Sequence, residues 1–103
     1  MTQEQFIKKY NLKEVTEPVR NSDGKYIDKL AGYTATLHSI SYDLHISVIL
    51  HEQSDNCYRL ILKSNISTAL YSYPGKEIFA MHTTELSLAE KITEDLINTY
   101  INL

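Results

Sequence analysis

The feature that most constrains the fold is an alternation of apolar and polar residues through the middle of the chain. From Tyr33 to Lys63, apolar side chains fall mostly on every second position, as in TLHSISYDLHISVIL. A period of two places alternate side chains on opposite faces of a strand, whereas a helix repeats every 3.6 residues. The pattern therefore predicts an antiparallel sheet with one face turned to a core.

Five strands are expected in this region and just beyond it. The breaks between them are short, so consecutive strands should be antiparallel neighbours in a meander. The expected strands are 33 to 40, 44 to 52, 57 to 63, 66 to 73 and 76 to 82, with turns at Tyr42-Asp43, Ser54-Asp55-Asn56, Ser64-Asn65 and Pro74-Gly75. Asn21-Ser22-Asp23-Gly24 predicts a further hairpin, over 14 to 20 and 25 to 30, in which the alternation is weaker.

Helices are predicted at both ends of the chain. Thr2 and Gln5 fit a capping box at the start of a short helix over 3 to 10. Ser87 and Glu90 fit a second capping box, followed by apolar residues at helical spacing. A chain of 103 residues is long enough for one core, so we expect a single α+β domain over 1–103. The apolar residues at i, i+4 spacing in the C-terminal helix are Leu88, Ile92, Leu96 and Tyr100.

The turns fix an expected register for the sheet. A turn at Tyr42-Asp43 places Leu37 opposite Val48, and the next turn places Val48 opposite Leu62. One apolar face results, and the C-terminal helix is expected to pack on it. The members of this face are Tyr33, Ala35, Leu37, Leu44, Ile46, Val48, Leu50, Tyr58, Leu60, Leu62, Ala69, Tyr71, Ile78 and Ala80.

The opposite face of the expected sheet also carries large apolar side chains, among polar residues such as Thr34 and Ser47. A sheet face left to water normally shows few of them, and an exposed apolar patch marks a contact site. Either the N-terminal helix with residues 12 to 30 covers this face, or a second copy or another protein does. The expected partner surface consists of Ile40, Ile49, Ile61, Ile66, Leu70, Phe79, Met81, Tyr42, Tyr73, Arg59 and His51.

Three of the four histidines fall between residues 37 and 51, which raises the question of a metal site. His45 and His51 share a face but stand about 20 Å apart at ~3.3 Å per residue, too far to hold one ion. His38 lies diagonal to His45, but this pair lacks a third ligand. His82 is expected on the other face, so we predict neither a metal nor any other cofactor.

An alternative is a small enzyme or ligand binder that uses the side of the sheet with Cys57, His51, His38 and His45. Cys57 and His51 are diagonal in the expected register, which is the minimum for a thiol and its base. Nothing in the sequence supplies an orienting group for the histidine or an oxyanion pocket. A non-catalytic role is therefore favoured.

Composition narrows the function classes further. A net charge of −3 and the lack of any basic run longer than Lys8-Lys9 argue against direct nucleic-acid binding. The longest apolar run, Ile78 to Met81, is far short of the ~20 residues that span a bilayer. A single cysteine fits a reducing cytoplasm. Ile, Lys, Asn and Tyr, which have AT-rich codons, are abundant in this sequence, and this bias indicates a low-GC bacterium or its phage. For a small acidic protein from such a source, one role that fits is inhibition of a host defence protein.

Overall fold

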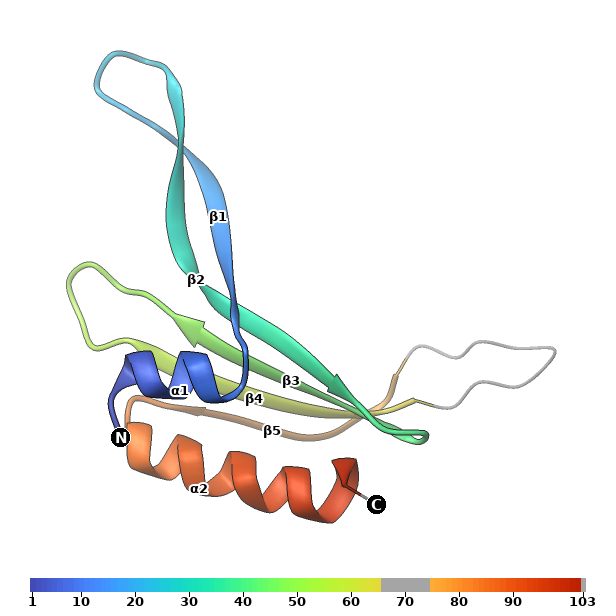
Figure 1. Ribbon diagram of the computed structural model, residues 1–103. Coiled ribbons are helices and arrows are strands. Elements are labelled where there is room, and N and C mark those ends of the chain that lie inside the picture. Colours follow the sequence, from blue (N-terminus) through green and yellow to red (C-terminus); the bar gives the residue numbers. More distant parts are fainter. Residues whose placement is uncertain (66–74, 103) are drawn as a thin grey trace, which may run out of the picture.

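The computed structural model describes residues 1–65 and 75–102, which form an α+β fold (Figure 1). Strands adjacent in sequence are antiparallel neighbours, so the sheet order is β1-β2-β3-β4-β5. The predicted five-stranded meander with a helix at each end is confirmed. In chain order the elements are α1 (Gln3–Lys9), β1 (Lys13–Arg20), β2 (Tyr26–His38), β3 (Tyr42–Ile49), β4 (Cys57–Ser64), β5 (Glu77–Thr83), α2 (Leu86–Leu96) and a terminal π-helical turn, η1 (Ile97–Ile101).

The hairpin predicted around Asn21 to Gly24 forms the first two strands of the sheet. Asn21 Oδ1 accepts hydrogen bonds from the backbone N–H groups of Asp23 and Lys25, and Gly24 has a φ of 78°. Glycine tolerates this left-handed conformation because it has no Cβ. β2 then runs on without a break through both stretches that the sequence predicted as separate strands. The far half of this hairpin extends as an arm beyond the rest of the sheet (Figure 1).

The register of the central strands differs from the predicted one by an even number of residues. Leu37 lies opposite Leu44, whereas the sequence placed it opposite Val48, a shift of 48 − 44 = 4 positions. The shift arises because the turn comes earlier, where Ser39 and Tyr42 close it through two hydrogen bonds. An even shift leaves every side chain on its predicted face, so the face assignment of β2, β3 and β4 is right.

β5 pairs directly with β4, and the strand predicted over 66 to 73 falls outside the described residues. Phe79 lies opposite Leu62 and Met81 lies opposite Leu60, so both belong to the helix-covered face. Their predicted place on the opposite face is wrong. The prediction had set another strand between β4 and β5, and it missed the irregularity between Leu62 and Lys63 that shifts the pairing.

The other two β5 residues with an assigned face, Ile78 and Ala80, also differ from the prediction. Ala80 pairs with Ile61 on the face away from the helices, and Ile78 is 47% exposed at the irregularity. Neither belongs to the buried cluster in which the sequence placed it. Because Ile78, Phe79, Ala80 and Met81 are all apolar, alternation carried no information about which pair faces inward.

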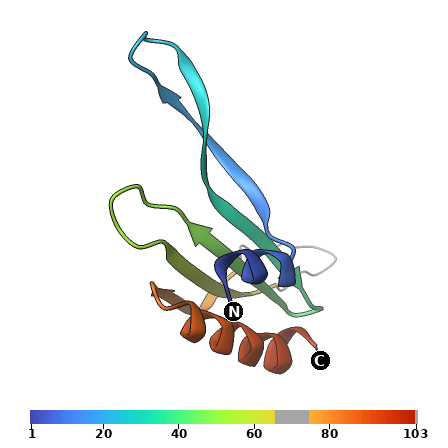
Figure 2. The same ribbon diagram turned by 60° about the vertical axis from the view of Figure 1, so that its left-hand side comes forward.

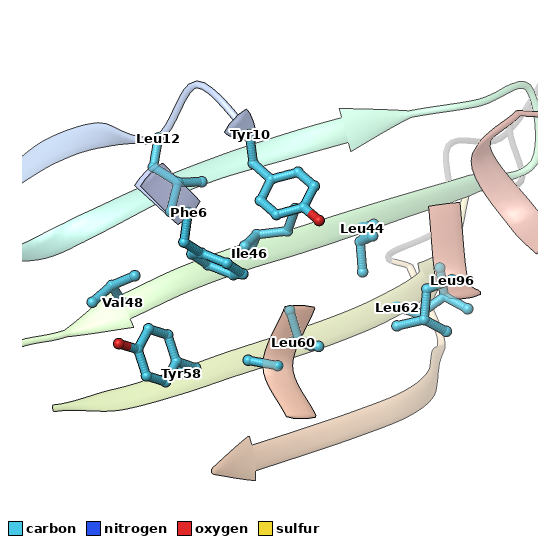
Figure 3. Close-up of a cluster of buried hydrophobic side chains, with 11 residues drawn as sticks. Phe6, Tyr10, Leu12, Leu44, Ile46, Val48, Tyr58, Leu60, Leu62 and Leu96 are labelled. Carbon is cyan, nitrogen blue, oxygen red and sulfur yellow. The ribbon is translucent and has the colours of Figure 1, made fainter. Parts of the chain in front are cut away.

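The core lies between the sheet and the two helices (Figure 3). The side chains of Val48 and Leu60 are buried in the same cluster, as the sequence predicted. Phe6 from α1 is fully buried, with its ring edge-on to Tyr10 and Tyr58 at centroid distances of 5.0 and 5.5 Å. The buried apolar residues are Phe6, Tyr10, Leu12, Leu44, Ile46, Val48, Tyr58, Leu60, Leu62, Ala89 and Leu96.

Both helices lie on the same side of the sheet (Figures 1 and 2). The predicted Thr2 capping box is present at the start of α1. Polar contacts then tie α1 to α2: the Tyr10 hydroxyl donates to Glu94 Oε1 at 2.6 Å, and Lys9 Nζ lies 2.9 Å from the same oxygen. These bonds lower the pKa of Glu94, first through Lys9 and then through Tyr10. The N-terminal helix therefore covers the core face, and not the opposite face for which it was one expected cover.

α2 begins one residue before the predicted capping box. Glu85 precedes the helix and makes no side-chain cap, so the capping role predicted for Ser87 is wrong. Leu88, predicted on the apolar side, is 37% exposed, whereas Ala89 and Thr93 are buried. The buried Thr93 hydroxyl is satisfied because it donates to the Ala89 carbonyl at 2.6 Å. Within the described residues no helix has the length and apolar character needed to cross a membrane.

Candidate functional site

The side of the sheet opposite α1 and α2 is the candidate site, and we call it the helix-free face. Cross-strand partners point to the same side of a sheet, so the face can be read from the strand pairing. It carries Thr34, Thr36 and His38 from β2, Asp43, His45, Ser47 and Ile49 from β3, Cys57, Arg59, Ile61 and Lys63 from β4, and Ala80 and His82 from β5.

One row of this face crosses the whole sheet. Lys13 pairs with Thr34, Thr34 with Ser47, Ser47 with Arg59, and Arg59 with His82. We call these residues the five-strand row. The row has two cations and a histidine, with two hydroxyls between them, and no carboxylate. Thr34 Oγ1 donates to the Ile46 carbonyl at 3.1 Å and lies 3.0 Å from Ser47 Oγ, so these hydroxyls are bonded within the sheet.

A hollow of about 320 Å³ opens beside this row over Gly32. Val15, Ile49 and Arg59 all contribute to its lining. Val15 is on β1 and Arg59 is on β4, three strands away in the sheet. At ~4.8 Å per strand, the backbones of these two strands are roughly 14 Å apart in a flat sheet. Both reach one hollow because the Arg59 side chain is long and Gly32 between them has no side chain, so the hollow extends from the β1 edge toward β4.

A second hollow, of about 650 Å³, lies between the β1-β2 hairpin and the loop after β3. Lys29 and Glu52 both line it and form an ion pair. His51 lies here, exposed, with its backbone N–H donating to Asn56 Oδ1 at 3.1 Å. The predicted partner residue His51 is thus near the edge of the helix-free face rather than on it.

The histidines on β2 and β3 are held by single neighbours. His38 Nδ1 lies 2.6 Å from Asp43 Oδ1, and His45 Nδ1 lies 2.8 Å from Thr36 Oγ1. Among residues 1–65 and 75–102, no three His, Cys, Asp or Glu side chains come close enough together to ligate a metal ion.

The thiol on this face meets a different histidine from the one that the sequence suggested. Cys57 Sγ lies 3.9 Å from His82 Nδ1, whereas the predicted neighbour was His51. The face assigned to His82 was wrong for the same reason as that of Phe79, because β5 pairs directly with β4. A catalytic dyad needs a group that orients the base. In the part of the chain that the structure describes, His82 has no carboxylate or carbonyl partner in such a position.

Three of the residues predicted for a partner surface lie on the helix-free face: Ile49, Ile61 and Arg59. Ile40 is in the β2-β3 turn and is 97% exposed. Tyr42 belongs to the covered side, where its ring packs edge-on against Tyr100 at a centroid distance of 4.9 Å. Phe79 and Met81 are on the covered side as well, and Ile66, Leu70 and Tyr73 lie outside the described residues.

Sequence reasoning missed two members of the five-strand row, Lys13 and His82. To place Lys13 in this row, the strand pairing of the hairpin around Asn21 to Gly24 would have to be extended back to the start of β1. To place His82 there, the direct pairing of β4 with β5 would have to be known. Each depends on a non-local strand contact, and local alternation carries no signal for either.

His45 provides a test of the electrostatics on this face. Partial burial lowers the pKa of His45, and the positive charge of Lys63 lowers it further. Its NMR titration midpoint should therefore lie below the ordinary value of about 6.5. Lys63→Gln should raise the midpoint, and the matched variant Lys91→Gln on α2 should not.

The same shift has a consequence for stability. The unfolded chain binds this proton more tightly than the folded chain, so the His45 contribution to the free energy of unfolding decreases as the pH drops from about 6.5 through the lower folded pKa. A His45 titration midpoint above 6.5, or a midpoint that does not change in Lys63→Gln, would contradict this description of the electrostatics of the face.

No protein-family model, curated protein or solved structure matches this chain.

Proposed function

We propose that this protein is a small non-catalytic binding protein whose helix-free face docks against another protein. The observation that carries the proposal is the layer arrangement. Both helices pack on one side of the sheet, and within residues 1–65 and 75–102 no helix lies over Ile49, Ile61 and the hollow on the other side. Apolar side chains on a shaped, open face are typical of contact surfaces.

A cover formed by the described residues of the chain itself has less support. α1 belongs to the core on the other side, and β1 and β2 contribute to the sheet itself. Among the described residues of β1, Val15 alone lines the hollow beside Ile49 and Arg59, and the β2 residues that line it are part of the sheet. An external partner, either another protein or a second copy of this chain, is therefore the better explanation for the face.

The setting of this function is also a proposal. The residue types with AT-rich codons favour a low-GC bacterium or its phage, and the single cysteine favours the cytoplasm. A small acidic protein that occupies a host protein, such as an inhibitor of a defence nuclease, fits these features. The catalytic alternative rests on Cys57 and His82 alone, and we do not propose it.

Photo-crosslinking tests the docking face. Benzoylphenylalanine is placed at Ile61 on the helix-free face and, as a matched control, at the exposed Lys91 on α2, in the cells that make the protein. We expect one dominant protein adduct from position 61 and none of the same mass from position 91. The adduct partner is then purified and must bind the unmodified protein.

Two outcomes would count against the proposal. The same adducts in equal amounts from positions 61 and 91 would show that partners do not bind the helix-free face in preference to α2. No adduct at position 61 would show that nothing docks there.

A further inference from the structure

We propose that the five-strand row binds an acidic polypeptide segment, with one apolar side chain of that segment seated in the hollow over Gly32. The inference rests on the proposed function and specifies the chemistry of the partner. It is carried by the charge pattern of the helix-free face, by the lack of a carboxylate partner for Arg59 among the described residues, and by the dimensions of the row and the hollow.

The five-strand row carries two cations, Lys13 and Arg59, and no carboxylate, although the chain as a whole has a net charge of −3. Lys13 Nζ also donates to Asn11 Oδ1 at 2.9 Å. The carboxylates Asp43 and Glu77 stand in a different row, opposite His38 and Lys63 respectively. Asp43 is held there by His38 at 2.6 Å. The row through Arg59 is left with cations and no internal anion, so charge complementarity favours a negative partner.

Arg59 is the residue that carries recognition. It is half-buried and lines the hollow, and among the described residues no carboxylate lies within ion-pair distance of it. A guanidinium presents paired N–H donors that match a carboxylate. Thr34 Oγ1 donates to the Ile46 carbonyl and is bonded to Ser47 Oγ, so both hydroxyls are engaged within the sheet and form the floor of the row. Anion binding is left to Arg59, with Lys13 and His82 at the two ends of the row.

The dimensions fit a short segment. Five strands at ~4.8 Å spacing make the row about 19 Å long, which about six extended residues would span at ~3.3 Å each. The hollow of about 320 Å³ adjoins Arg59 and is bordered by Val15 and Ile49, so an apolar side chain can sit beside the paired carboxylate. The expected recognition element is therefore an Asp or Glu next to a large apolar residue.

Two other occupants are less consistent with this pattern. A second copy docked through the same face would bring the Arg59 and Lys13 side chains of both copies together, and like charges oppose such contact. A nucleic acid would need more phosphate-neutralising cations and aromatic rings for stacking. The five-strand row contains no Phe, Tyr or Trp, and its one aromatic ring is the imidazole of His82 at the β5 end, whereas Tyr33 and Tyr58 pack on the core side.

The test is selection of random dodecapeptides on the purified protein, followed by calorimetry with the synthetic consensus peptide. The wild type should select sequences in which Asp or Glu adjoins Leu, Ile, Val, Phe or Met. Arg59→Glu should weaken the consensus peptide at least tenfold, and Arg59→Gln should weaken it less. Lys91→Glu on α2 is the charge-matched control and should bind as the wild type does. Circular dichroism confirms that each variant is folded.

Each other result overturns the inference. A neutral or basic consensus, no selected peptide, or equal binding of the acidic peptide by Arg59→Glu would do so. So would Arg59-dependent binding of a fluorescent single-stranded DNA or RNA dodecamer in place of peptide, or a dimer in sedimentation that Arg59→Glu dissociates. A specific adduct at position 61 together with a neutral consensus would leave the proposed function standing and remove only its acidic chemistry.

Discussion

Gly32→Ala is expected to destabilise the protein by about 3 kcal/mol or more, because the added methyl group has no space. A Cβ at this position would overlap the backbone carbonyl oxygen of Val48 and lie 3.4 Å from Ile49 Cα. These are backbone atoms of the paired strand, so no side-chain rotation can relieve the overlap. β2 and β3 would have to separate beside the Val15–Thr16 irregularity.

Urea unfolding followed by circular dichroism measures this effect. Thr34→Ala, on the same strand and on the helix-free face, is the control and should cost about 1 kcal/mol, the value of one net hydrogen bond. A Gly32→Ala variant within 1 kcal/mol of the wild type would contradict the close approach of the two backbones.

The adjacent residues Leu60 and Ile61 should respond in opposite ways to the same substitution. Leu60 is fully buried between the sheet and the helices, whereas Ile61 points to the helix-free side. Leu60→Glu removes core packing worth about 2 to 5 kcal/mol and also buries a carboxyl group without a partner. We expect at least about 4 kcal/mol of destabilisation and loss of a cooperative thermal transition.

Ile61→Glu should keep that cooperative transition, with a melting temperature near that of the wild type. Its carboxylate can reach water and lies beside the cationic row. Thermal melts of the two variants provide the comparison. Equal destabilisation would show that something within the chain covers both sides of β4.

The period-two pattern was sufficient to predict the meander and the buried face of β3 and β4. Val48 and Leu60 share the core even though the predicted register was shifted, because an even shift preserves the faces. The pattern failed at β5, where four successive apolar residues give no alternation. The site depended on that strand and on the base of β1, so His82 and Lys13 were assigned incorrectly or not at all.

The side of the sheet on which α1 packs could not be predicted from the sequence either. Phe6, Ile7 and Tyr10 predict an apolar stripe on a short helix, and both faces of the sheet offered apolar partners. What places α1 on this side is a set of non-local contacts: Phe6 is buried against Tyr58, and Lys9 and Tyr10 contact Glu94 on α2.

The central claim is that the helix-free face is the docking surface. Its most direct test is binding of the partner identified by crosslinking, purified, to the wild type, to Ile61→Glu and to Leu88→Glu. Leu88 is an exposed apolar residue on α2, so the third protein carries the same change on the other side of the molecule. Burying one such side chain contributes about 1.5 to 3 kcal/mol, so Ile61→Glu should weaken binding at least tenfold at an unchanged melting temperature, and Leu88→Glu should bind as the wild type does. Full affinity in Ile61→Glu, with affinity lost in Leu88→Glu, would place the docking surface on the helices and contradict the claim.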